Sequence, residues 1–196
     1  MVRVRTGQPA GSDPARKVRT HMEAKNLAEL YGLPLVDWQR VEARLSGGPE
    51  RLAGAGGADN RSWLATTNPD GSPHLTCLGP LYVSGLFYFT TGGATRKGRN
   101  LARDPRCTLG ISTDEFDLAV DGDAVLVDDP DVVADLAVRW AAGGWPAAVD
   151  ATGIALTAEY SAPSAGPPPW QVYRLTPRQA TVVLSASPGG ATRWRF

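Results

Sequence analysis

The chain has 196 residues, of which 42% are hydrophobic, and its 20 Lys and Arg residues balance its 20 Asp and Glu residues. This length and apolar content predict one globular domain with a true core, which excludes a chain that is disordered throughout. A net charge of zero argues against general binding to nucleic acids or to anionic membranes, because both need a cationic surface.

The charges are unevenly distributed. Residues 1–20 carry five cations against one acid, a net charge of +4, and we interpret 1–21 as a flexible basic leader. Between Arg106 and Arg139 the chain has nine acids and no cation. No apolar run is long enough to span a membrane and no secretory signal is visible, so we expect a cytoplasmic protein with reduced cysteines.

The N-terminal part of the remaining chain has helical signals. The spacing of residues 22–31 predicts a helix that ends at Gly32. A second helix, capped by Asp37, is expected to run through Leu45 and to be followed by a Gly-rich loop over 46–60.

In the rest of the chain the sequence pattern mainly predicts antiparallel strands separated by turns. Ser84-Gly85 is typical of a two-residue hairpin turn. Helices are predicted over 95–103 and from Pro130 to Trp140, and a Pro-rich segment occupies 161–169. Together these elements indicate a small barrel with inserted helices. The predicted strands are 63–67, 74–83, 86–91, 106–113, 116–127, 170–176 and 179–185.

One segment carries the strongest chemical signal. A strand ends in hydroxyl groups, two glycines allow a tight backbone turn, and a helix begins with two cations. Free N–H groups at a helix N-terminus, the helix dipole and adjacent cations together make an anion site, whereas the alternative is an ordinary capped helix with a basic face. The residues concerned are Thr90, Thr91, Gly92, Gly93, Thr95, Arg96, Lys97 and Asn100.

Five motifs follow one another along the chain, at 68–73, 86–91, 95–101, 104–106 and 190–196. In this order they resemble the flavin-binding split-barrel proteins of the pyridoxamine 5'-phosphate oxidase-like superfamily. The resemblance implies a mainly β, α+β fold, an antiparallel split barrel of six to seven strands, formed by 22–196 as a single domain. It also implies a homodimer with cofactor sites at the subunit interface.

The resemblance further implies which residues hold the cofactor. Thr95, Arg96 and Lys97, on the helix that also carries Asn100, would bind its phosphate, and Asp117 can accept a hydrogen bond from the ring. The partner subunit would contribute Trp194 with Arg193 or Arg195. The ring and ribityl chain would be lined by Thr76, Cys77, Leu78, Gly79, Thr90 and Thr91.

The implied function is that of an oxidoreductase that moves a hydride between FMN and a small organic substrate. A deazaflavin, coenzyme F420, is the alternative cofactor, and a non-catalytic protein that binds or sequesters a flavin is the alternative function. Oxidation of pyridoxine phosphate is not expected, because no histidine follows His74. No metal site is expected, since neither histidine has a ligand partner nearby. We interpret Cys77 as a small buried hydrophobic residue.

Overall fold

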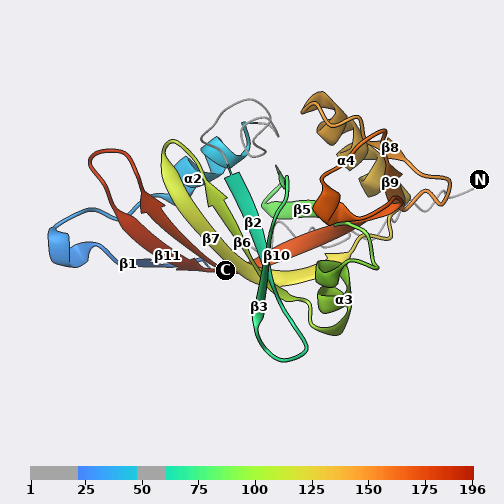
Figure 1. Ribbon diagram of the computed structural model, residues 1–196. Helices are drawn as coiled ribbons and strands as arrows, with labels where there is room; N and C mark the ends of the chain where they lie inside the picture. Colours follow the sequence, from blue (N-terminus) through green and yellow to red (C-terminus); the bar gives the residue numbers. More distant parts are fainter. Residues whose placement is uncertain (1–21, 48–60) are drawn as a thin grey trace, which may run out of the picture.

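The computed structural model describes residues 22–47 and 61–196, and the predicted basic leader and most of the predicted loop 46–60 lie outside these ranges. The described chain forms a mostly antiparallel sheet with three α-helices (Figure 1). The sheet is open, and the expected split barrel of the α+β class is confirmed. No helix within the described ranges is long and apolar enough to cross a membrane. The helices are α2 (Trp38–Leu45), α3 (Arg96–Arg103) and α4 (Pro130–Ala142).

The sheet has one main path of seven strands, from which four shorter or side strands branch. In spatial order the path is β1 (Glu23–Asn26), β11 (Ala191–Arg195), β10 (Trp170–Leu184), β7 (Phe116–Leu126), β6 (Arg106–Ser112), β2 (Arg61–Thr67) and β3 (Pro73–Cys77). The branches are β4 (Leu81–Val83), β5 (Leu86–Thr91), β8 (Ala148–Val149) and β9 (Ala155–Thr157).

Strand β10 is where the sheet divides. One edge pairs with β5 over 171–175 and with β11 over 179–183, while β7 runs along the other edge. The change of partner coincides with an irregularity between Pro177 and Gln179, as expected where a proline removes a ladder donor. The sequence had predicted two separate strands here. That prediction is wrong, because the shared partner β7 keeps both halves in one strand.

The first described segment is a strand and not the helix predicted over 22–31. Strand β1 pairs with β11 from Glu23 opposite Arg195 to Asn26 opposite Thr192, and a single 3-10 turn follows. Leu30 and Tyr31 are 89% and 77% exposed, so a helix here would bury no apolar face. Pairing with a strand distant in sequence therefore overrides the local helix propensity. The partner β11 was itself missed, as were β8 and β9.

Local capping and turn signals are confirmed. The Asp37 side chain accepts a hydrogen bond from a backbone N–H of the first turn of α2, and Thr95 does the same for α3. Ser84 and Gly85 have φ angles of 52° and 85° and join β4 to β5 as a tight hairpin turn. The strand predicted over 74–83 is interrupted after Cys77 and continues as β4.

Two apolar clusters organise the molecule. The main core fills the barrel around residues such as Phe87, Leu109 and Val182. A second cluster packs α4 against β5, β9 and β10 around Leu136 and Leu156. Because of this second cluster, the chain between β7 and β10 is held beside β4 and β5, where it faces the end of β3 (Figure 1).

Gly122 of β7 shows how closely β10 approaches at its bend. A Cβ atom at this position would lie 2.3 Å from the carbonyl oxygen of Thr176. We expect Gly122→Ala to lower the free energy of unfolding by about 1–3 kcal/mol, because one backbone must shift. Gly110 of β6 is the matched control, since the nearest atom to a Cβ there is 3.8 Å away. Urea denaturation of both variants tests this, and equal effects would contradict it.

Candidate functional site

Helix α3 is attached to the end of β2 by a buried asparagine. The Asn100 side-chain amide donates to Thr66 Oγ1 and to Asn68 Oδ1, both at 3.1 Å. The side chain is 2% exposed, so these bonds are shielded from water. Asn100, predicted to lie at the cofactor site, therefore positions α3 relative to the turn between β2 and β3.

The hydroxyl groups of Thr91 and Thr95 are hydrogen-bonded at the beginning of α3. Thr95 Oγ1 donates to the Gly92 carbonyl at 2.7 Å and accepts from the Gly98 N–H at 3.1 Å. Thr91 Oγ1 lies 2.9 Å from Thr95 Oγ1. Thr95 is thus a helix cap whose bonds are made within the protein, and its predicted contact with a phosphate would be an additional one.

Gly92 and Gly93 are needed for close packing and not for a special backbone conformation, which corrects the sequence-based reason for them. Neither has a positive φ angle. A Cβ atom on Gly92 would lie 2.9 Å from the Ala165 carbonyl oxygen, and one on Gly93 would lie 2.8 Å from Gln171 Oε1. The Gly92 N–H also donates to Ala165 at 2.9 Å. The loop at residue 165 is therefore docked on the start of α3.

Arg96 and Lys97 lie in different surroundings, although the sequence placed them in one phosphate site. Lys97 is 2% exposed, and its Nζ donates to the Ser164 carbonyl at 2.5 Å. Burial lowers the pKa of the Lys97 ammonium group. Arg96 is exposed. Of the two cations, Arg96 is the one that is open to an anion from solvent.

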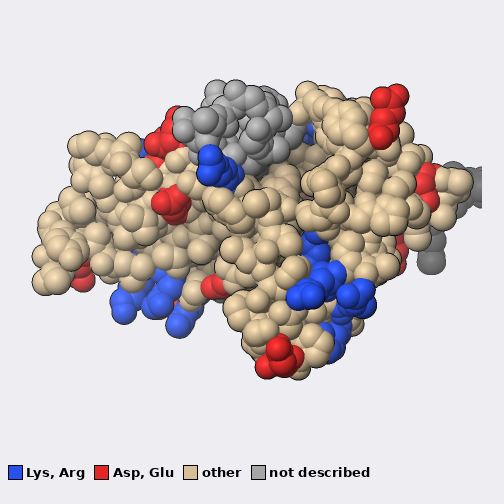
Figure 2. All heavy atoms as spheres, in the orientation of Figure 1, with Lys and Arg blue, Asp and Glu red and all other residues tan. Residues whose placement is uncertain are grey.

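Arg96 is one of several charged residues that line a hollow of about 720 Å³ beside the turn between β2 and β3, which we call the basic hollow. Figure 2 shows the cations gathered over α3. Asp70, an acid of this hollow, is bonded to Ser72 at 2.6 and 3.0 Å, and these bonds lower its pKa. Asp70 therefore stays ionised, but three arginines against this one carboxylate leave an excess of positive charge that favours an anionic ligand. The hollow is lined by Asn68, Pro69, Asp70, Ser72, Arg96, Arg99, Asn100 and Arg103.

A second, mainly apolar pocket of about 350 Å³ lies at the other end of β3, and we call it the aromatic pocket. Its floor is formed by residues within and after β3, by β5 and by the first turn of α3. Its roof is formed by the end of α4 and by the loop that follows β9. The floor includes Cys77, Leu78, Gly79, Thr90 and Lys97, and the roof includes Trp140, Trp145, Tyr160, Ser164 and Ala165.

Strand β3 joins the two pockets, since residues of the basic hollow precede it and the floor of the aromatic pocket includes its last residue. His74 and Thr76 lie on the more buried face of this strand. Burial, followed by the positive charges of Arg96 and Lys97, lowers the pKa of His74. Thr76 Oγ1 is buried and has no hydrogen-bond partner among the described residues. An unsatisfied hydroxyl on this strand fits a site that is completed by a ligand.

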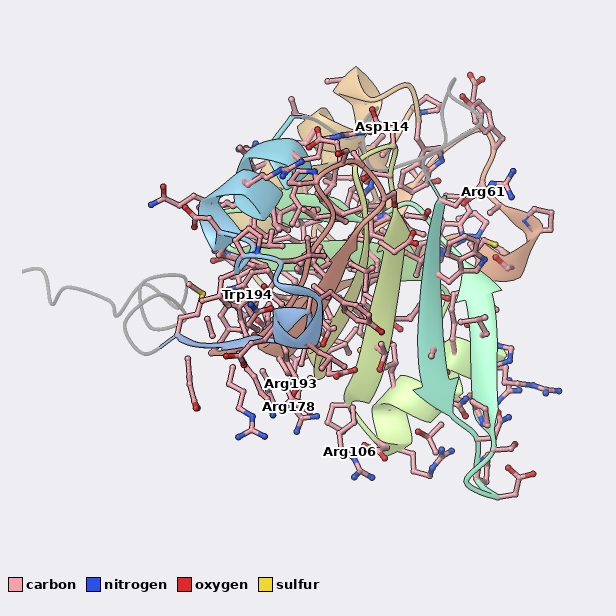
Figure 3. All side chains as sticks on the ribbon, turned by 90° about the vertical axis from the view of Figure 1, so that its left-hand side faces the viewer. Arg61, Arg106, Asp114, Arg178, Arg193 and Trp194 are labelled. Carbon is pink, nitrogen blue, oxygen red and sulfur yellow. The ribbon has the colours of Figure 1, made fainter. Side chains whose placement is uncertain are left out.

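Four predicted site residues lie elsewhere in the chain. Asp117 of β7 is exposed, and Arg193 and Arg195 lie on β11. Figure 3 shows Arg193 and Trp194 at the end of the sheet formed by β1 and β11, away from β3. Within one chain these residues do not join the others.

Trp194 lies in the core of its own chain. It is 1% exposed, and its ring packs edge-on against Trp38 with centroids 5.1 Å apart. The resemblance assigns Trp194 to the cofactor of a partner subunit, whereas the structure gives this residue a use within its own chain. The strand β11 supplies that use, since alternation along it turns Trp194 into the core and both arginines away from it.

Sequence reasoning missed the residues of the roof. Trp140 donates its Nε1–H to the Gly79 carbonyl at 3.3 Å, and Trp145 donates to Tyr160 at 2.7 Å. Four strands of the sheet, β4 to β7, lie between β3 and these tryptophans in sequence, and no motif links the tryptophans to β3. The cluster of tryptophans around a Pro-rich segment was the available signal.

The two cysteines lie in different environments. Cys77 is exposed, which corrects the interpretation of a buried residue, whereas Cys107 is buried. Burial, followed by the charge of Asp123, raises the pKa of the Cys107 thiol to about 12. No group of three or more His, Cys, Asp or Glu in the described ranges is placed to hold a metal ion.

We expect a thiol reagent at pH 8 to modify Cys77 in the native protein and to spare Cys107, because the thiolate is the reactive form. Counting the thiols modified before and after denaturation tests this. Modification of both thiols in the native protein at the same rate would contradict it.

The chain was compared with known proteins. The family model described as pyridoxamine 5'-phosphate oxidase matches residues 57–184. No curated protein matches the chain. A candidate 5-nitroimidazole antibiotic resistance protein from Bacteroides thetaiotaomicron has a similar structure, with a TM-score of 0.53 and 13% identity over 90% of this chain and 93% of that one.

Two further solved structures share the fold. A pyridoxamine 5'-phosphate oxidase-related, FMN-binding protein from Nostoc punctiforme has a TM-score of 0.51 and 19% identity over 81% of this chain and 91% of that one. A conserved hypothetical protein from Mycobacterium tuberculosis has a TM-score of 0.51 and 17% identity over 74% and 83%. At these identities the likeness concerns the fold.

Proposed function

The chain belongs to the pyridoxamine 5'-phosphate oxidase family, and from this premise we propose that it is an oxidoreductase that binds a flavin-type cofactor along β3. The observation that carries the proposal is the placement of a basic hollow and an apolar pocket at the two ends of one strand. FMN has the matching form, with a planar ring at one end and a phosphate at the other. When bound, such a cofactor supplies the hydride-transfer chemistry.

The protein's own residues bind and orient the cofactor in this proposal. Arg96 provides the main charge for the phosphate, because Lys97 already donates to Ser164. The free N–H groups at the start of α3 add to this charge. Thr76, with its unpartnered hydroxyl, and the backbone at Leu78 lie where the chain between phosphate and ring would pass.

The proposal also concerns which of two cofactors, FMN or a deazaflavin, the protein binds. We favour FMN, because the Nostoc protein with the same fold is named as FMN-binding. A deazaflavin with a longer anionic tail would use Arg99 and Arg103 in addition, and both arginines line the basic hollow. The visible absorption band of the purified protein distinguishes the two cofactors.

The experiment that tests the function combines binding and reduction. We expect the protein to retain or bind FMN at micromolar concentration, and to pass electrons from anaerobically reduced cofactor to an added organic acceptor. Binding without any electron transfer would favour the alternative, a protein that only binds or sequesters flavin. If neither FMN nor a deazaflavin binds, both functions are excluded.

We also propose that the chain acts as a homodimer through the outer face of the sheet. Small residues such as Gly110, Ala119 and Thr181 adjoin one another across β6, β7 and β10 on this face. Leu75 and Val183, at its two sides, are 62% and 52% exposed. A second copy packed here would cover these side chains.

The dimer would also bring Arg193, which lies far from β3 in its own chain, to a cofactor site. Register places Thr181 of this outer face opposite Arg193 of β11, so a second copy could bring that arginine to the cofactor of its partner. Sedimentation analysis is expected to give the mass of a dimer for the native protein and of a monomer for Leu75→Glu. A native monomer at micromolar concentration would contradict this proposal.

A further inference from the structure

His74 lies on the inner face of β3, where helix α3 is attached to the sheet. In the pairing of β3 with β2, His74 is opposite Thr66, which is 3% exposed, so both side chains point toward the inside of the barrel. Thr66 Oγ1 accepts the hydrogen bond from the Asn100 amide of α3 at 3.1 Å. Arg96 precedes Asn100 by four residues and lies on the same side of the helix. The half-buried imidazole is therefore next to the cationic start of α3.

The surroundings of His74 favour its neutral form. Burial, followed by the positive charges of Arg96 and Lys97 on α3, lowers the pKa of the imidazole. From β2 the side chain opposite His74 is an uncharged threonine. Asp70, the acid of the turn before β3, is already bonded to Ser72. The imidazole is thus uncharged at neutral pH in the free protein.

An anion bound at Arg96 would reverse this balance. A phosphate monoester brings about two negative charges, and a negative charge beside an imidazole favours the protonated ring. The protonated ring donates from both nitrogens. Lys97 does not supply this charge freely, because its buried ammonium group already donates to the Ser164 carbonyl. A second mobile cation beside Arg96 therefore has to come from His74.

From these observations we propose that His74 is a further phosphate-binding residue of the cofactor site, and that its imidazole takes up a proton from solvent when the phosphate binds. The inference rests on the proposed function in taking the phosphate of FMN as the anion. Proton and phosphate then strengthen each other's binding, since coupling between two ligands is reciprocal. The gain in affinity is complete below the pKa of His74 in the free protein, and it is lost as the pH rises through the pKa in the complex.

Proton NMR of the imidazole signals tests the inference directly. The chain has two histidines, His21 and His74, and His74→Gln assigns their signals. We expect saturating FMN to raise the pKa of His74. Riboflavin, which has the same ring and no phosphate, should leave it unchanged. An unchanged pKa in the FMN complex, or an equal rise with riboflavin, would overturn the inference while the proposed function stands.

The affinity for FMN gives a second readout, measured by fluorescence titration. Relative to His74→Gln, the wild type should bind FMN roughly five- to tenfold more tightly at pH 6 and equally at pH 8.5. Comparing the two proteins at each pH cancels the titration of the phosphate itself, whose second pKa is about 6. His21→Gln is the matched control and should keep the wild-type profile. A difference between wild type and His74→Gln that does not change with pH would show a purely structural role and overturn the inference.

Inorganic phosphate separates the inference from the proposed function. If FMN does not bind, the proposed function fails, and the NMR titration is repeated with millimolar phosphate. A rise in the pKa of His74 that is absent in Arg96→Ala would keep His74 as part of an anion site. No rise with phosphate would overturn the inference as well.

Discussion

Replacing Arg96 by alanine is expected to weaken FMN binding by roughly 10- to 100-fold, which is the effect of losing one or two charge-assisted hydrogen bonds. Arg96 is exposed and lines the basic hollow, so its removal leaves the core intact. Titration of FMN fluorescence against the apoprotein measures the dissociation constant, and urea denaturation confirms that stability is unchanged.

Two other variants make the result for Arg96 specific. Arg96→Lys keeps the charge but loses the planar pair of donors, so we expect an intermediate affinity. Arg139→Ala removes an arginine of α4 that pairs with Asp135 at 2.7 Å on the surface, and it should not change FMN binding. Wild-type affinity in Arg96→Ala would overturn the assignment of the phosphate to this end of β3.

Replacing Trp194 by alanine is expected to lower the free energy of unfolding by about 3–5 kcal/mol, as for other large aromatic residues in cores. The side chain is 1% exposed and packs against Trp38, whose ring also contacts Phe196 with centroids 5.1 Å apart. Its loss would leave a cavity between α2 and β11. The free energy of unfolding is measured by urea denaturation.

The control for Trp194 is an aromatic residue without such packing. Tyr31 is 77% exposed, and Tyr31→Ala should change stability by less than about 0.5 kcal/mol. A loss in Trp194→Ala no larger than in Tyr31→Ala would contradict the burial described here. Weaker FMN binding by a fully folded Trp194→Ala protein would instead revive the role that the sequence analysis gave to this residue.

Local signals in the sequence were sufficient for much of the fold. The caps Asp37 and Thr95 and the turn at Ser84-Gly85 depend only on residues that are close in sequence. All three predictions are confirmed. The helix predicted over 22–31 is wrong, because residues 23–26 pair with β11, nearly the whole chain length away. Pairing over such distances leaves no trace in the local pattern.

The candidate site, like the fold, was predicted from the sequence only in part. The order of motifs around β3 and α3 drew attention to Thr76, Arg96 and Lys97, and the structure brings these residues to one strand and one helix start. The structure also places the two cations in different surroundings, because the ammonium group of Lys97 donates a hydrogen bond to the Ser164 carbonyl. The reason for Gly92 changed as well, from backbone freedom to the close approach of Ala165.

By itself, the sequence determined the antiparallel class of the fold, the start of α3 and the balance of charge that permits one small cationic site in a neutral chain. Only the tertiary structure decided that Trp194 belongs to the core, that three arginines share one hollow and that Trp140, Trp145 and Tyr160 cover the pocket at the other end of β3. The physical reason is that caps and turns depend on neighbours in the chain, whereas a pocket depends on side chains that meet only when distant strands have paired.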